Sequence, residues 1–266
     1  MKRLAILSLL GLLVFSNQIW AQTQRVVDIP TRPGITQRMV VIEPEKPKAA
    51  VVLFPGGHGG LQISSSGSFT WGANNFLVRT RQLFASFNLM VAVVDAPSDR
   101  QNPPYLAGFR QTPEHVSDIR AVIAWIKQQR NIPVWLVGTS RGTQSVAFIV
   151  TQLAQSDGGP DGVVLTSTIL TDKPPARPVP ELPLDRIKVP ILIVHHKQDG
   201  CQHCPYDNLP GLMEKLTAAP RKELFTVEGG RSKGDPCEAM AYHGFNGTEQ
   251  QVVTKIADWI TQQIQH

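Results

Sequence analysis

Short apolar runs alternate with amphipathic stretches along most of the chain. Runs of about four to eight residues rich in valine, isoleucine and leucine are typical of buried strands, whereas apolar residues spaced three and four apart are typical of one helix face. Strands are predicted at 49–55, 89–97, 134–138, 162–168, 189–196 and 223–229. Helices are predicted at 74–87, 118–129, 142–155, 209–218 and 249–264. Two earlier strands, 24–29 and 36–44, have no helix between them, so we expect an antiparallel hairpin at a sheet edge.

The order of these elements predicts the fold. The central strands are almost continuously apolar, as parallel strands covered on both faces are. Their alternation with helices predicts a doubly wound α/β fold with a mostly parallel sheet of about eight strands. No repeat or linker interrupts residues 22–266, so we expect one domain with a small or absent lid.

Three long segments without a strand or helix pattern follow predicted strands, at 57–72, 96–114 and 170–188. Loops of this length inside a compact domain are usually functional. Open α/β sheets bind their ligands at the carboxyl ends of the strands, where these three loops begin.

Residues 1–21 have the pattern of a cleaved secretory signal. Lys2 and Arg3 precede an apolar stretch, 4–15, that is too short to cross a bilayer comfortably, and Ala21 is a small residue at the cleavage position. We therefore expect a secreted or periplasmic protein without stable membrane insertion after cleavage. The formal charge of +5 falls by two, to +3, without Lys2 and Arg3. The remaining basic residues form no long run, which argues against nucleic acid as a partner.

One motif carries a candidate nucleophile. Residues 138–142 read G-T-S-R-G, a G-x-S-x-G sequence between a predicted strand and a predicted helix. In that context a sharp turn lifts the serine, Ser140, above the sheet edge at a helix N-terminus, where partial positive charge helps to stabilise an oxyanion.

A serine nucleophile needs a base and an acid, which in hydrolases with this motif follow in the order serine, acid, histidine. Of the histidines after Ser140, His243 is the one in the loop between the last strand and the last helix, from which a base can reach the serine. Asp199 lies just after the strand 189–196 and is our candidate acid. Asp172, one strand earlier, remains the alternative, and the acid would orient the imidazole and stabilise its charged form.

The oxyanion hole requires two backbone N–H donors. Arg141 follows the nucleophile and supplies one, and the glycine-rich sequence 55–60 (PGGHGG) supplies the other, for which we choose Gly57. The neighbouring His58 is interpreted as a wall of the pocket.

Four motifs in this order, PGGHGG, GTSRG, HHKQD and HGF, resemble the α/β-hydrolase superfamily. More narrowly, they are similar to secreted bacterial members of its dienelactone-hydrolase-like branch, over nearly the whole chain after residue 21. The resemblance implies an acyl-enzyme on Ser140 and its hydrolysis by water that His243 activates. Dienelactone hydrolases proper use a cysteine nucleophile, so the serine favours general ester hydrolysis over lactone chemistry.

The stretch 195–204 (HHKQDGCQHC) also has features of a metal or redox site. A zinc site would use Cys201, Cys204, His203 and Cys237, but one C-x-x-C and a distant cysteine fall short of the usual two ligand pairs. A thioredoxin-like C-x-x-C opens a helix early in a smaller fold. We therefore interpret the stretch as the acid corner of a triad and expect no metal or organic cofactor.

Three cysteines in an oxidising compartment allow one disulfide. Cys201 lies two residues after Asp199, and Cys237 lies six residues before His243. If acid and base meet, these loops are neighbours, so we predict the disulfide Cys201–Cys237 rather than one from Cys204, which precedes Pro205 and turns into the next crossover.

The sequence thus predicts a secreted serine hydrolase acting on a small to medium ester, a small-molecule partner. A peptidase or amidase with the same triad, or an inactive binding protein on a hydrolase scaffold, remains an alternative. Basic residues at 100, 110, 141, 231 and 233 fall near the predicted site, where they would attract an acidic acyl or leaving group. Nothing in the sequence predicts an oligomeric state.

Overall fold

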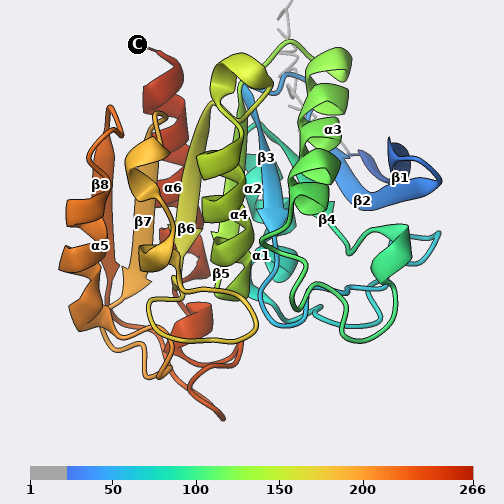
Figure 1. Ribbon diagram of the computed structural model, residues 1–266. Helices are drawn as coiled ribbons and strands as arrows, with labels where there is room; N and C mark the ends of the chain where they lie inside the picture. Colours follow the sequence, from blue (N-terminus) through green and yellow to red (C-terminus); the bar gives the residue numbers. More distant parts are fainter. Residues whose placement is uncertain (1–22, 266) are drawn as a thin grey trace, which may run out of the picture.

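A computed structural model describes residues 23–265 and places their eight strands in one sheet with helices on both faces (Figure 1). The strand order is β1-β2-β4-β3-β5-β6-β7-β8. The antiparallel part comprises β1 (Thr23–Arg32), β2 (Ile35–Glu43) and the pairing of β2 with β4 (Leu89–Val94). The parallel strands are β3 (Ala49–Phe54), β4, β5 (Val134–Thr139), β6 (Gly162–Thr166), β7 (Ile191–His196) and β8 (Lys222–Val227). The mostly parallel sheet and the edge hairpin are both as expected; the predicted signal at 1–21 lies outside the described residues.

The two faces of the sheet bury separate hydrophobic layers. One layer packs under α3 (Pro113–Gln129), α4 (Arg141–Gln152) and α5 (Leu209–Lys215). The other packs under α1 (Phe76–Arg79), α2 (Arg81–Ser86) and α6 (Glu249–Ile264), on the opposite side of the sheet in Figure 1. Every residue of β3, β4, β5, β6 and β7 is buried. Continuous burial explains why these strands read as apolar runs rather than as alternating patterns.

The single helix predicted at 74–87 is wrong, because α1 and α2 are separate and meet at Thr80. The buried hydroxyl of Thr80 donates to the carbonyl of Phe76 at 2.6 Å. Threonine hydroxyls that bond to a nearby carbonyl compete with the regular helical ladder, which accounts for the interruption. Asn75 caps the first segment by accepting from the N–H of Leu77.

The connections after β3, β4, β6, β7 and β8 gather at the carboxyl ends of the parallel strands, at the lower end of Figure 1. The connection after β6 contains two short 3₁₀ turns, Val179–Glu181 and Leu184–Arg186, so within residues 23–265 no helical lid is inserted there. In the same part of the chain, no helix has the length and apolar character needed to cross a membrane.

A tight turn at Ser140 joins β5 to α4. Ser140 has φ 53° and ψ −127°, a conformation that costs L-residues on the order of 1–3 kcal/mol. Two glycines let the surrounding backbone close around it. A Cβ on Gly138 would lie 2.6 Å from the carbonyl oxygen of Gly142, and a Cβ on Gly142 would lie 2.0 Å from that of Phe54 in β3. The turn at Ser140 is therefore held by direct backbone contact with a neighbouring strand.

We expect Gly142→Ala to destabilise the fold by at least about 3 kcal/mol, because its new methyl group meets rigid backbone and not a flexible side chain. Gly211→Ala is the matched control, because Gly211 is exposed in α5 and a Cβ there meets nothing within 4 Å. The control should be neutral or stabilising by up to about 1 kcal/mol. Urea unfolding of both variants measures the difference, and equal stabilities would contradict the backbone contact.

Candidate active site

A pocket of about 630 Å³ opens at the carboxyl ends of the central strands. Ser140 enters it from the turn after β5, Gly57 from the loop after β3, and His243 from the loop between β8 and α6. Of the residues predicted for the site, those that line the pocket are Gly57, His58, Ser140, Arg141, Cys201, Cys237 and His243. Segments far apart in sequence are thus brought together at one cavity.

Asp199 lies behind His243, within hydrogen-bond distance of it. The Nδ1 atom of His243 is 2.9 Å from Oδ2 of Asp199, and both side chains are buried. The other carboxylate oxygen accepts from the N–H of Cys201 at 2.9 Å. A carboxylate at Nδ1 holds the proton there and leaves the lone pair of the neutral ring on Nε2. Asp172, the alternative acid, is exposed and makes no hydrogen bond with His243.

The Nε2 atom of His243 is buried and has no hydrogen-bond partner within residues 23–265. The loop that carries His243 is fixed, since Ser167 donates its hydroxyl to the carbonyl of His243 at 2.6 Å. The ring therefore keeps a free basic nitrogen while its backbone and its other nitrogen are held.

The disulfide expected between Cys201 and Cys237 is present. It joins the loop after β7, which carries Asp199, to the loop that leads into His243. Cys204 is the free cysteine; it is buried and its Sγ donates to the carbonyl of Ser167 at 3.4 Å. Burial raises the pKa of the Cys204 thiol well above its usual range, so the thiol stays protonated at neutral pH.

A second buried histidine, His195, also contacts Asp199. Nε2 of His195 is 2.9 Å from the carbonyl oxygen of Cys204 and 3.5 Å from Oδ2 of Asp199. Burial lowers the pKa of His195 to about 4, so the ring is neutral at pH 7. His196 is held on the other side, with Nε2 2.8 Å from the carbonyl of Gly229 and its ring stacked on Tyr242. The two histidines at the end of β7 thus contact both the loop that carries Asp199 and the segment after β8 that leads to His243.

The loop that carries Gly57 is anchored by a buried guanidinium. Arg110 donates to the carbonyl oxygens of Pro55 at 3.1 Å and Gly57 at 3.3 Å, and to the hydroxyl of Ser145 at 2.9 Å. Burial, and then the charge of Arg141, lower the pKa of Arg110 to about 9, and it has no carboxylate partner within residues 23–265. The N–H of Gly57 has no acceptor among the described residues.

Arg110 was expected to attract an acidic substrate, and this expectation is wrong because its guanidinium is enclosed and does not reach the pocket. Arg100 is exposed and lies over the ring of Phe109, 4.9 Å from its centroid. Arg231 and Lys233 are exposed outside the pocket. Of the five basic residues, only Arg141 lines the cavity.

Asp95 organises the rest of the same loop. Its carboxylate accepts from the backbone N–H groups of Leu61 at 2.7 Å, Ile63 at 2.8 Å and Ala96 at 2.7 Å. These hydrogen bonds tie the loop after β3 to the end of β4. The position of Asp95 at the end of β4 is a sequence signal for such an anchor, but its partners could not be read from the sequence.

His58 stands in the pocket wall between two aromatic rings. Its ring centroid is 3.8 Å from that of Trp71 and 4.3 Å from that of Tyr105. Nδ1 accepts from the N–H of Gly60 at 3.1 Å, and burial lowers the pKa of the ring. This geometry suits a neutral wall more than a proton carrier.

Two cationic side chains also line the pocket. Arg141 and Lys173 are half-buried, line the pocket, and form no ion pair within residues 23–265. His203 lies beside them; burial and then the charge of Lys173 lower its pKa. Glu238, which is exposed, is the acidic residue of the lining. Lys173 and His203 were not singled out as pocket residues by the sequence, because their placement depends on the conformation of long loops.

We expect the buried, neutral His195 to make stability depend on pH. The unfolded chain protonates this histidine below about pH 6.5 whereas the folded state does so only near pH 4, so the unfolding free energy falls as the pH falls between these values. The loss should reach about 3 kcal/mol at pH 4. His195→Gln retains an N–H donor but does not titrate. Between about pH 6.5 and pH 4 the variant should therefore lose about 3 kcal/mol less unfolding free energy than the wild type. Chemical denaturation of both proteins at several pH values tests this, and parallel curves would refute it.

No protein-family model and no curated protein matches the sequence. Solved structures do match. An α/β serine hydrolase homologue from Coxiella burnetii has a TM-score of 0.62 at 15% identity, with 90% of this chain and 98% of that chain covered. An esterase of Pyrococcus furiosus has 0.67 at 13% identity, with 91% of each chain covered. A dienelactone hydrolase from Anabaena variabilis has 0.63 at 11% identity, with 91% of this chain and 98% of that one covered. With its eight-stranded sheet and this strand order, the chain has the α/β-hydrolase fold.

Proposed function

We propose that this protein is a serine esterase with Ser140 as nucleophile, His243 as base and Asp199 as acid. The observation that carries the proposal is one cavity that holds a serine on a strained strand–helix turn and a histidine whose Nδ1 contacts a buried carboxylate. Esterases and serine hydrolases among the structural neighbours are consistent with it.

In the first half-reaction, Nε2 of His243 takes the proton of Ser140 as Oγ attacks the ester carbonyl. Asp199 stabilises the imidazolium that forms. The N–H groups of Gly57 and Arg141 donate to the developing oxyanion, and Arg110 preorganises this loop from behind. The imidazolium then protonates the leaving alcohol, which departs and leaves an acyl-enzyme.

In the second half-reaction, His243 takes a proton from water, and the hydroxide attacks the acyl carbon. Collapse of this intermediate returns the proton to Ser140 and releases a carboxylic acid. An amidase would use the same steps with an amine leaving group. We favour ester cleavage because esterases are among the proteins of similar structure. An inactive binding protein would have no need for a strained serine in the same pocket as a free basic nitrogen.

We also propose that the preferred esters carry a negative charge. Arg141 and Lys173 stand half-buried on the pocket wall without a carboxylate partner in residues 23–265. A partly desolvated guanidinium gains most from a carboxylate or similar anion, which it binds through two parallel hydrogen bonds. An acidic group on the substrate would supply the partner that the chain lacks.

Secretion is part of the same proposal. The N-terminal pattern at 1–21 and a disulfide between loops of the site both suit an oxidising compartment.

Ser140→Ala and His243→Ala should each lower kcat by about 10⁶, and the double variant should lose little more, because the triad acts as a unit. Asp199→Asn should lose about 10⁴, since the imidazole would take the wrong tautomer. Asp172→Asn is the matched control and should retain near-normal activity. Hydrolysis of p-nitrophenyl acetate measures all of them. A dead Asp172→Asn with an active Asp199→Asn would move the acid one strand earlier.

Arg141→Gln and Lys173→Gln should each raise KM for an acidic ester by about tenfold. A change of that size corresponds to the loss of the binding free energy of one charge-assisted hydrogen bond. The acidic probe is p-nitrophenyl hydrogen glutarate and the neutral reference of similar length is p-nitrophenyl valerate. KM for the neutral ester should not change, and the preference of the wild type should weaken with salt. Equal effects on both esters would show that the two cations do not select charge.

A further inference from the structure

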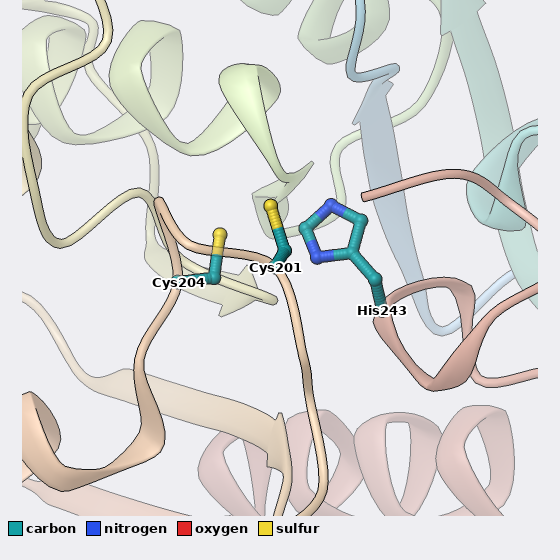
Figure 2. Close-up of side chains that lie close together, drawn as sticks. All are labelled: Cys201, Cys204 and His243. Carbon is teal, nitrogen blue, oxygen red and sulfur yellow. The ribbon is translucent and has the colours of Figure 1, made fainter. Parts of the chain in front are cut away.

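Three side chains that bind metal ions well meet beside the pocket (Figure 2). Cys201 and Cys204 come from the loop after β7, and His243 comes from the loop before α6. One donor atom of each lies within 4.8 Å of the others, and all three residues are buried. Within residues 23–265, this is the one group of three such side chains. In Figure 2 the two sulfur atoms point to the same side and the imidazole ring lies next to Cys201.

Two thiolates and an imidazole are a donor set for zinc or another thiophilic divalent cation. Sulfur atoms about 2.3 Å from a tetrahedral zinc ion lie about 3.8 Å from each other. Shifts of roughly 1 Å, which side-chain rotation can provide, would close the observed group around an ion. Three protein ligands would leave a fourth position open.

The histidine provides an independent indication. Nε2 of His243 is buried and unpartnered within the described residues, so its lone pair is free. Nδ1 contacts Asp199, and a carboxylate on the second nitrogen is the usual support for a histidine that ligates zinc. The arrangement that makes His243 a candidate base would therefore also make it a good ligand.

The disulfide closes this site to metal, since the Cys201 sulfur is bonded to that of Cys237 and is not a thiolate. The bond lies at the pocket: both cysteines line it, and Cys237 is half-buried. A dithiol reductant can break it by thiol–disulfide exchange. The S–S bond gains two electrons and two protons, and the reductant becomes a disulfide.

We propose that reduction of Cys201–Cys237 opens a site for zinc on Cys201, Cys204 and His243. On binding, the two thiols release their protons and the ion takes the lone pair of the histidine. If His243 is the base of the proposed esterase, on which this consequence rests, the bound ion blocks hydrolysis. The oxidised chain would be active and unable to bind zinc at this position, and the reduced chain would bind zinc and be inactive.

The test uses Cys237→Ser in the full chain, because this change leaves Cys201 as a free thiol without any reductant. Zinc binding is measured by equilibrium dialysis with elemental analysis. Thiolate ligation is measured by the charge-transfer absorption of added cobalt. Cys237→Ser should bind one zinc ion per chain and show the cobalt–thiolate band.

The matched control is the double variant Cys237→Ser, Cys204→Ser, which lacks one ligand of the proposed site. It should bind zinc at least about 100-fold more weakly than Cys237→Ser, because removing a ligand costs more affinity than removing a residue that only supports a ligand. Oxidised wild type should bind none at the same concentration. If Cys237→Ser does not fold, wild type reduced with a phosphine gives the same comparison against reduced Cys204→Ser.

Equal zinc binding by the single and double variants would overturn the proposal, as would equal binding by the oxidised wild type. Zinc should also inhibit ester hydrolysis by Cys237→Ser, with recovery on adding a chelator. The binding measurements do not depend on hydrolysis. Zinc binding that requires an open disulfide, found without any esterase activity, would therefore refute only the proposed function. Esterase activity without such zinc binding would refute only the zinc site.

Discussion

The contact between the turn at Ser140 and the backbone of β3 is the constraint on which the site depends. The turn can take its positive φ only while Gly138 and Gly142 leave room for the chain to close on itself and on Phe54. Tight packing of this kind fixes the serine at the carboxyl edge of the sheet, between the two buried hydrophobic layers. The sheet thus supports a local strain that an isolated strand and helix would relax.

Around this fixed turn, buried polar side chains hold the loops that complete the pocket. Asp95 and Arg110 bind the backbone of the loop after β3, and His195 binds that of the loop after β7. Burying these three polar side chains costs desolvation free energy. Their hydrogen bonds to loop backbone groups, which would otherwise be unpaired, offset that cost. Loops without helices or strands of their own can therefore present groups such as the Gly57 N–H in a defined direction.

The sequence was sufficient for the features that local patterns encode. Apolar runs located the strands, and the G-x-S-x-G motif located the turn at Ser140. The order of elements singled out Asp199 and His243, whose side chains the structure brings together. Long-range contacts decide the rest. Arg110 was expected near the substrate, but it supports the loop that carries Gly57 from outside the pocket. Lys173, which does line the pocket, was not predicted. In both cases the position depends on how a long loop folds, and no periodic pattern in the sequence encodes that.

The central claim is that Ser140 is a nucleophile activated by His243. Its most direct test is labelling of the protein with a fluorophosphonate, followed by mass spectrometry of the intact chain and of its peptides. We expect one adduct per chain, on Ser140, formed rapidly in the wild type and very slowly in His243→Ala. No adduct, or an adduct on another serine, would contradict it.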